Sequence, residues 1–275
     1  MRTFASLLAT VVAIIAMWVA VPSLWMQYRV IDRDGFTSFV EPMARDQQVR
    51  TVIGDEIARQ IAAQTDVVPE AVIRPATLAY TRSDQFPADF ADVLGQQHDF
   101  LFEPPRDAAA RNDILELDLT AMVNRVVRQF GITGVSVTGP IRIPLSETRR
   151  SGLEAGRYHQ AAQQITRLAY GSTALAVIAA LAALALARRR ALSLAALGAG
   201  AVIAGVCSYV VAWVLRDRAE AEFSGAVSSP RQVAQIIIEK TSDDLQNTAL
   251  VVVVVGSALT VATVLVSALR IGFRR

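Results

Sequence analysis

Several residue types that carry protein chemistry are scarce in this 275-residue sequence. It has one cysteine, Cys207, so an internal disulfide is excluded and any folded domain must be stabilised by packing. It has two histidines, with neither an H-x-x-x-H spacing nor a cysteine partner, which argues against a zinc site. A G-x-S-x-G elbow, an S-x-x-K motif and a phosphate-binding loop are also missing, so the sequence carries none of these hydrolase or nucleotide-binding signatures.

Charge is absent from four long stretches of the sequence. Each stretch has at least 20 residues, and they cover 3–28, 168–187, 191–215 and 245–269. A helix of about 20 residues, rising 1.5 Å per residue, crosses a bilayer core of about 30 Å. One such run could be a buried core helix, but four runs flanked by charge predict four transmembrane helices.

The basic residues that connect these stretches are distributed unevenly. If the N-terminus is cytoplasmic, the inner segments hold seven basic and no acidic residues, including Arg188, Arg189 and Arg190. The outer segment 27–167 has 16 basic and 19 acidic residues, and the outer segment 216–244 has four and six. Positive residues favour the cytoplasmic side during insertion, so both termini are predicted to be cytoplasmic. The positive charge therefore marks membrane anchors and argues against a nucleic-acid partner.

The predicted organisation alternates membrane spans with exterior segments. We expect transmembrane helix 1 with a short cytoplasmic N-terminus over 1–28, an extracytoplasmic domain with a helical stalk over 29–166, transmembrane helix 2 over 167–187, a cytoplasmic turn at 188–190, transmembrane helix 3 over 191–215, a short extracytoplasmic helical segment over 216–244, transmembrane helix 4 over 245–269 and a cytoplasmic tail over 270–275. The first segment could instead be a cleaved signal peptide. Its apolar stretch is long and its small-x-small sites are poor, so we expect an uncleaved anchor. Trp18 and Trp25 suit an interfacial aromatic belt at its outer end.

Small residues recur at four-residue spacing in the third predicted span. Gly200, Ala204 and Ser208 form one row, and Ala201 and Gly205 form another. Because small side chains allow helices to approach closely, we expect the four spans to pack as a bundle. The spans hold no charged side chain, which argues against a pump or a coupled transporter, since such proteins keep ionisable groups in the membrane.

The exterior segment 29–166 is long enough to form its own core. Helical spacing predicts one amphipathic helix over 41–64, with Asp46 as its N-cap, and another over 87–102. The region between them contains Pro75 and other prolines, and we expect it to have mixed structure.

Alternating apolar residues predict two short strands, in DILELDL (113–119) and GVSVTGPIRIPL (134–145). The stretch between them predicts a short helix that ends at Gly131. From Ser146 a helix is expected to continue without a break, as a stalk, into the second span. The predicted fold class is an α-helical membrane protein with four transmembrane helices and a mostly helical α+β extracytoplasmic domain.

The two histidines are the residues most open to a catalytic or ligand-binding role. His98, with Asp99, Asp89 and Asp92, could form an acidic cation site, although charge on exterior helices often serves only solvation. An enzyme would require His98 or His159 to face a cleft beside carboxylates. We expect instead that each histidine is a helix residue with a hydrogen-bonded ring. No catalytic, cofactor-binding or metal-binding residue is predicted.

Four further stretches are similar to a known group of sequences. They are DRDGFTSFVEPMARDQQV, FPADFADVLGQQHDF, ILELDLTAMVNRV and ARRRAL. In their order they resemble uncharacterised actinobacterial integral membrane proteins with one anchor, an exterior domain and three further transmembrane helices. Phe90 stands where that group usually has tryptophan, and Asp46-Gln47 where it usually has Asp-Pro. The resemblance implies the same topology and implies no activity, substrate or catalytic residue.

These observations predict a non-enzymatic membrane protein of the bacterial envelope. Its extracytoplasmic domain would bind a protein, lipid or cell-wall partner, and membrane lipids would surround its spans. The alternative is an accessory protein that handles or transports lipids or small molecules, with a groove at the outer leaflet. A sensor would need larger inner segments, and no cofactor is expected.

Overall fold

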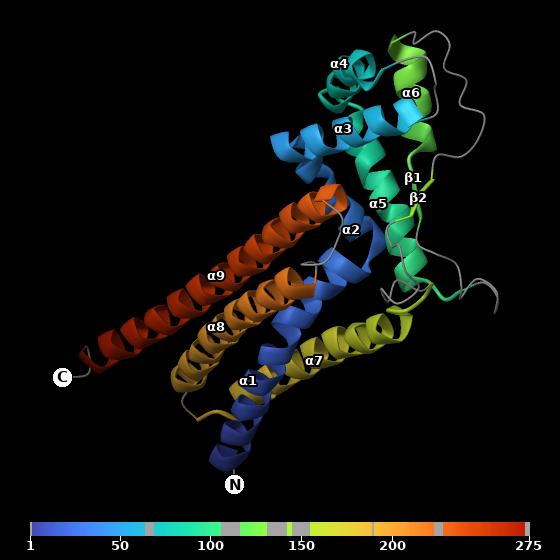
Figure 1. Ribbon diagram of the computed structural model, residues 1–275. Helices are drawn as coiled ribbons and strands as arrows, with labels where there is room; N and C mark the ends of the chain where they lie inside the picture. Colours follow the sequence, from blue (N-terminus) through green and yellow to red (C-terminus); the bar gives the residue numbers. More distant parts are fainter. Residues whose placement is uncertain are drawn as a thin grey trace. The chain divides into compact units, whose positions relative to one another are not determined.

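A computed structural model describes residues 2–63, 69–105, 116–130, 142–144, 155–188, 190–222 and 228–272 (Figure 1). Its elements are α1 (Arg2–Met26), the π-helix η1 (Gln27–Ile31), α2 (Arg33–Val40), the 3-10 helix η2 (Glu41–Arg45), α3 (Gln47–Ala63), α4 (Glu70–Thr81), α5 (Phe86–Phe102), β1 (Glu116–Asp118), α6 (Thr120–Phe130), β2 (Arg142–Pro144), α7 (His159–Leu186), α8 (Arg190–Glu222) and α9 (Ser228–Gly272). The chain forms two units. The bundle unit comprises Met1–Tyr28, Gln163–Ala221 and Glu239–Arg275, and the domain unit comprises Arg29–Ala162 and Glu222–Ile238.

Four helices in the described chain are long and apolar enough to cross a membrane. They run over Arg2–Ile31, His159–Leu186, Arg190–Val214 and Gln235–Ser267. Each overlaps one of the charge-free stretches, so the prediction of four candidate spans is confirmed. Helix is the structure expected there, because a main-chain amide in hydrocarbon must find its hydrogen-bond partner within its own segment. The described chain is thus nearly all helical and consistent with a multi-pass membrane protein.

Helices α1, α7 and α8 of the bundle unit meet at a small apolar core. Ala13, Ala179 and Leu197, one from each helix, are its buried residues. Gly200 of α8 lies so close to α1 that a Cβ there would be 2.4 Å from a side-chain carbon of Ile14. The predicted role of small residues in the third span, close helix approach, is confirmed at this position.

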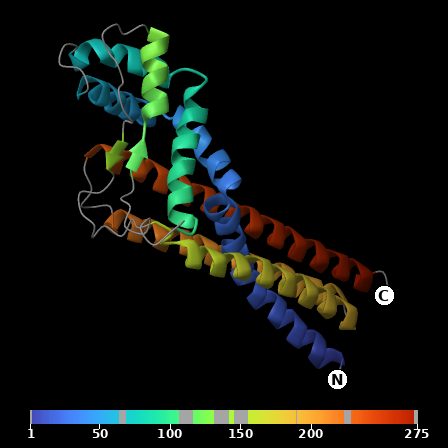
Figure 2. The same cartoon turned by 90° about the vertical axis from the view of Figure 1, so that its right-hand side faces the viewer.

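Helices α8 and α9 run side by side and touch through glycines (Figure 1; Figure 2). A Cβ on Gly256 would lie 2.7 Å from the carbonyl oxygen of Gly198. A Cβ on Gly205 would lie 2.7 Å from the carbonyl oxygen of Ala249. Because the neighbouring atoms belong to the main chain, a larger residue at either glycine would force the two helices apart.

Polar side chains connect the bundle helices at the end away from the arginine run. The Trp25 indole on α1 donates a hydrogen bond to the Asp244 carboxylate on α9, at 2.8 Å. The Thr166 hydroxyl on α7 donates to the side-chain oxygen of Gln27, at 2.6 Å. Trp25 is only 7% exposed, whereas Trp18 is 39% exposed. Trp25 is therefore packed against the other helices of the bundle unit, whereas Trp18 is open to the surroundings, and the expected interfacial belt stays a prediction.

The domain unit has its own hydrophobic core, built on α3, α4, α5 and α6. The Asp46 carboxylate accepts a hydrogen bond from the Gln48 amide at 2.9 Å, and so caps α3 as predicted. The helix begins only at Gln47, because residues 41–45 form η2. The largest fully buried side chains all belong to this unit: Tyr80, Phe86, Ile57, Ile61, Ile73, Leu119, Met122, Val40, Val49, Val123 and Val126.

The region between α3 and α5 differs from the expected mixed structure. It forms the 12-residue helix α4, with Pro75 inside it. A proline in a helix removes one main-chain hydrogen bond, which disfavours the helix locally. Ile73 is 1% exposed and Tyr80 is fully buried, so burial of the apolar face of α4 offsets this cost.

The prediction of an unbroken stalk helix is wrong. Residues 155–158 form a turn before α7, and residues 145–154 lie outside the described chain. Gly156 has a φ of 69°, and a Cβ there would lie 2.6 Å from a ring carbon of Pro105. Its amide donates a hydrogen bond to the Phe100 carbonyl at 2.8 Å. This turn requires glycine, because only glycine adopts a positive φ without steric cost.

The predicted strands are represented by one short antiparallel ladder. β1 pairs with β2 from Glu116 opposite Pro144 to Asp118 opposite Arg142. The rest of the predicted strand segments, and the helix stop at Gly131, lie outside the described residues. A ladder this short forms no sheet layer, so the α+β description of the exterior domain is not supported.

We expect Gly256→Ala to destabilise the bundle unit by about 1–3 kcal/mol, because the added methyl group would meet the Gly198 carbonyl. Thermal unfolding in detergent micelles, followed by circular dichroism, measures the effect. Gly171→Ala is the matched control, since no atom lies within 4 Å of a Cβ at that position on α7. Equal melting temperatures for the two variants would contradict the α8–α9 contact.

Candidate functional site

The His98 ring lies between two phenylalanine rings in the domain unit. Phe102, four residues later on α5, stacks on it with a centroid distance of 4.6 Å. Phe36 of α2 stacks on it at 4.9 Å. His98 is 6% exposed, so the imidazole is part of the packed interior between α2 and α5. The spacing of four residues on a helix could have indicated the Phe102 contact, whereas the Phe36 contact depends on the tertiary structure.

The ring nitrogens of His98 differ in their surroundings. Nε2 lies 2.9 Å from the carbonyl oxygen of Val30 in the last turn of η1, where carbonyls lack a partner within the helix. A carbonyl only accepts, so this contact assigns the ring proton to Nε2. Nδ1 has no hydrogen-bond partner within the described chain. Its nearest carboxylate oxygen, on Asp99, is 3.6 Å away.

The Asp99 carboxylate is already engaged by an arginine. Arg33 of α2 contacts both of its oxygens through Nε, at 3.0 and 2.8 Å. This hydrogen bond, together with the charge of the carboxylate, raises the pKa of the Arg33 guanidinium. The Arg33–Asp99 pair therefore links α2 to α5 beside the imidazole.

The second histidine meets the same part of α5. His159 begins α7, and its Nδ1 lies 2.9 Å from the carbonyl oxygen of Phe102. Tyr158 lies against the other aromatic groups, with its ring centroid 5.9 Å from that of Phe102. Phe102 thus contacts both histidines, through its ring and through its carbonyl group. The expectation that both histidines have hydrogen-bonded rings is confirmed.

The aspartates suggested as a cation site do not converge with His98. Asp89 binds Arg125, with the Asp89 carboxylate 2.8 Å from the guanidinium Nε. Asp92 is exposed and accepts a hydrogen bond from the Gln96 amide at 3.1 Å. Among the described residues, no group of three or more histidine, cysteine or acidic side chains is placed to hold one metal ion. The hypothesis of an acidic site around His98 is therefore wrong for the described chain.

Asp89 instead belongs to a polar cluster at the domain core. The Tyr80 hydroxyl of α4 donates to the Asp89 carboxylate of α5 at 2.6 Å, and Arg125 of α6 donates to the same carboxylate at 3.0 Å. Arg125 also donates to the Gln85 side-chain oxygen at 3.1 Å. Burial, followed by the hydrogen bond and charge of Asp89, raises the pKa of the Tyr80 phenol. The cluster joins the consecutive helices α4 and α5 to α6, which lies farther along the chain, and the sequence pattern did not indicate it.

In comparisons with known proteins, no family model, no curated protein and no solved structure matches this chain.

We expect His98→Ala to destabilise the domain unit by about 2–4 kcal/mol, because it removes both ring stacks and the hydrogen bond to Val30. His98→Phe keeps a ring in place and should cost only about 1–3 kcal/mol, the cost of leaving a buried carbonyl unpaired. Thermal unfolding of the purified chain measures both changes. Unchanged stability of His98→Ala, or a melting temperature of the unsubstituted chain that rises with Zn²⁺, would contradict a packing role.

The Tyr80 cluster predicts a pH dependence. The raised pKa means that the fold favours the neutral phenol, whose ordinary pKa is 10.0. The stabilisation is complete below pH 10 and is lost as the pH rises above 10, because the unfolded chain then ionises more readily. Unfolding by urea from pH 7 to 11 should show a steeper loss of stability for the unsubstituted chain than for Tyr80→Phe. Parallel pH profiles for the two proteins would show that the cluster is not coupled to folding.

Proposed function

We propose that this chain is a non-enzymatic protein of the bacterial plasma membrane whose domain unit lies outside the cytoplasm and binds a partner of the cell envelope. The partner is a protein, or a component of the membrane or cell wall. The observation that carries the proposal is that the domain unit has a hydrophobic core of its own, in a chain that also has four candidate spans. A folded domain joined to a membrane anchor is suited to holding a partner near the bilayer. We include in this proposal the resemblance to actinobacterial membrane proteins that have the same order of spans and exterior domain.

The orientation in this proposal rests on the distribution of charge. The two chain ends and the turn at 188–190 have only basic residues, whereas the segments 27–167 and 216–244 are mildly acidic. This asymmetry favours cytoplasmic termini and an extracytoplasmic domain unit.

The engagement of the ionisable groups supports binding over catalysis. Asp99 pairs with Arg33 and Asp89 with Arg125, and both histidine rings lie at hydrogen-bonding distance from main-chain carbonyls. A general base or nucleophile needs a reactive atom within reach of a substrate. The His98 ring is instead enclosed by Phe36 and Phe102, with little exposed surface.

The alternative is a protein that handles lipids or small molecules through a groove at the outer leaflet. In the bundle unit, a described groove lies beside Arg190, at the end opposite the Trp25–Asp244 hydrogen bond. That position is the inner leaflet in the proposed orientation. This groove therefore does not supply the outer-leaflet site that the alternative requires.

The proposal is tested by photo-cross-linking in cells. A photoreactive residue replaces Val72, an exposed side chain on α4 of the domain unit, and Val264, an exposed side chain on α9 within a candidate span. We expect a discrete cross-linked species, a protein or a wall fragment identifiable by mass spectrometry, at Val72 and only lipid adducts at Val264. Lipid alone at Val72 would favour the alternative, and no adduct there would contradict a partner at this face.

Cysteine labelling controls for the orientation. In a Cys207→Ser background, Asp84→Cys places a thiol at an exposed site between α4 and α5, and Arg188→Cys places one at the arginine run. A membrane-impermeant maleimide should label the first in intact cells and the second only after permeabilisation. Labelling of both in intact cells would contradict the proposed topology.

A further inference from the structure

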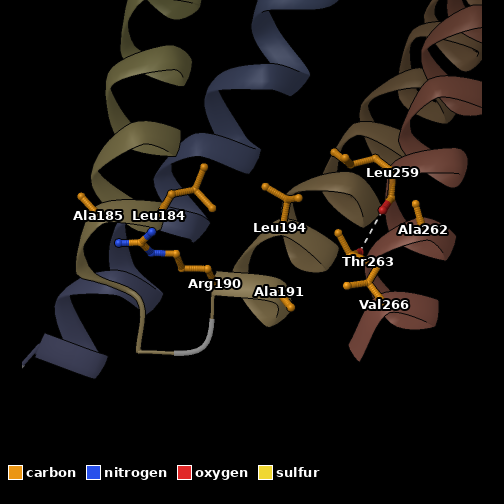
Figure 3. Close-up of a pocket in the computed structure, with 9 residues that line it drawn as sticks. All are labelled: Leu184, Ala185, Arg190, Ala191, Leu194, Leu259, Ala262, Thr263 and Val266. Carbon is orange, nitrogen blue, oxygen red and sulfur yellow. Dashed lines mark hydrogen bonds between the residues drawn. The ribbon is translucent and has the colours of Figure 1, made fainter. Parts of the chain in front are cut away.

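An apolar groove opens on the bundle unit at the arginine run (Figure 3). Its volume of about 630 Å³ lies within the range of about 300–1,000 Å³ that is usual for ligand sites. Figure 3 shows the Arg190 side chain reaching from α8 toward Leu184 and Ala185 at the end of α7. The lining residues are Leu184, Ala185, Arg190, Ala191, Leu194, Leu259, Ala262, Thr263 and Val266.

The polar groups of this lining have different partners. The Thr263 hydroxyl donates to the main-chain carbonyls of Leu259 and Thr260, each at 2.8 Å, so it is used within α9. Arg190 is exposed, and it is the only charged residue among the described lining residues. The groove therefore combines an apolar floor with one guanidinium group at its edge.

No carboxylate is available from the spans to neutralise this arginine. The sequence has no acidic residue in 1–31, in 155–216 or in 245–275, so none of the four helices carries one at the arginine end. Arg188 and Arg190 are both exposed there. Their positive charges are complementary to an anion from outside the chain.

We propose that this groove binds an anionic phospholipid, with an acyl chain along the apolar floor and the phosphate on the Arg190 guanidinium. A guanidinium group matches a phosphate with two parallel hydrogen bonds. Basic pockets between membrane helices on the cytoplasmic side bind anionic lipid headgroups, and anionic lipids are plentiful in that leaflet. The inference rests on the membrane placement and the proposed orientation of the spans, and not on the partner of the domain unit.

Native mass spectrometry of the full chain in detergent tests this site. With equal amounts of phosphatidylglycerol and phosphatidylcholine added, the unsubstituted protein should retain phosphatidylglycerol preferentially. Arg190→Gln should reduce that preference about fivefold, which corresponds to about 1 kcal/mol per basic residue at an anionic lipid surface. Arg2→Gln is the matched control, because Arg2 is a basic residue on α1 that does not line the groove.

A second variant tests the apolar floor without changing charge. Ala262→Phe places a ring in the groove and should reduce phosphatidylglycerol retention, whereas Val264→Phe, on the exposed surface of the same helix, should not. Arg190→Lys keeps the charge but loses the two-pronged geometry, so its loss should be smaller than that of Arg190→Gln. Melting temperatures verify that each variant is folded. If Ala262→Phe does not fold, the comparison of Arg190→Lys with Arg190→Gln tests the site instead.

Three results would overturn the proposal. They are equal retention of the two lipids by the unsubstituted protein, equal losses for Arg190→Gln and Arg2→Gln, and displacement of the lipid by excess inorganic phosphate. The second would indicate general surface attraction, and the third a phosphate site that makes no use of the groove. None of them affects the cross-linking result expected for the domain unit in cells, so the two proposals fail separately.

Discussion

The hydrogen-bonding requirement of main-chain amides in hydrocarbon is the constraint on which the rest of this structure depends. Four charge-free stretches can be accommodated there only as helices that satisfy their own amides, and the described chain has a helix at each of them. Charged side chains are absent from these stretches and lie at their ends. Trp25 and Asp244 meet at one end of the bundle unit, and Arg190 lies at the other.

The two units are stabilised by different interactions. Main-chain contact at glycines dominates between α8 and α9, where side chains as small as a methyl group have no room. The domain unit combines a core of large apolar side chains with ion pairs between helices, such as Arg33–Asp99 and Arg125–Asp89. Its histidines take part in this packing. The ionisable side chains named here therefore hold the helices of the domain unit together. Such a rigid domain is consistent with a binding role.

Features that depend on local sequence could be predicted, and those that depend on tertiary contacts could not. The four spans follow from charge-free length, and the cap at Asp46 follows from a short polar side chain before an apolar face. Helix α4 was missed because Pro75 disfavours a helix locally, while burial of Tyr80 favours it only in the folded unit. For the site, hydrogen-bonded histidine rings were expected, but the Phe36 stack and the Arg33–Asp99 pair join segments far apart in sequence.

The glycine contact between α8 and α9 also has a mechanical consequence. Moving α9 along its axis by one turn, about 5.4 Å, would bring Val252 or Thr260 to the place of Gly256. That place has no room for a branched side chain, because a Cβ there is already 2.7 Å from the Gly198 oxygen. The contact at Gly256 thus fixes the axial position of α9 relative to α8. Piston-like sliding of α9 along α8 is therefore blocked.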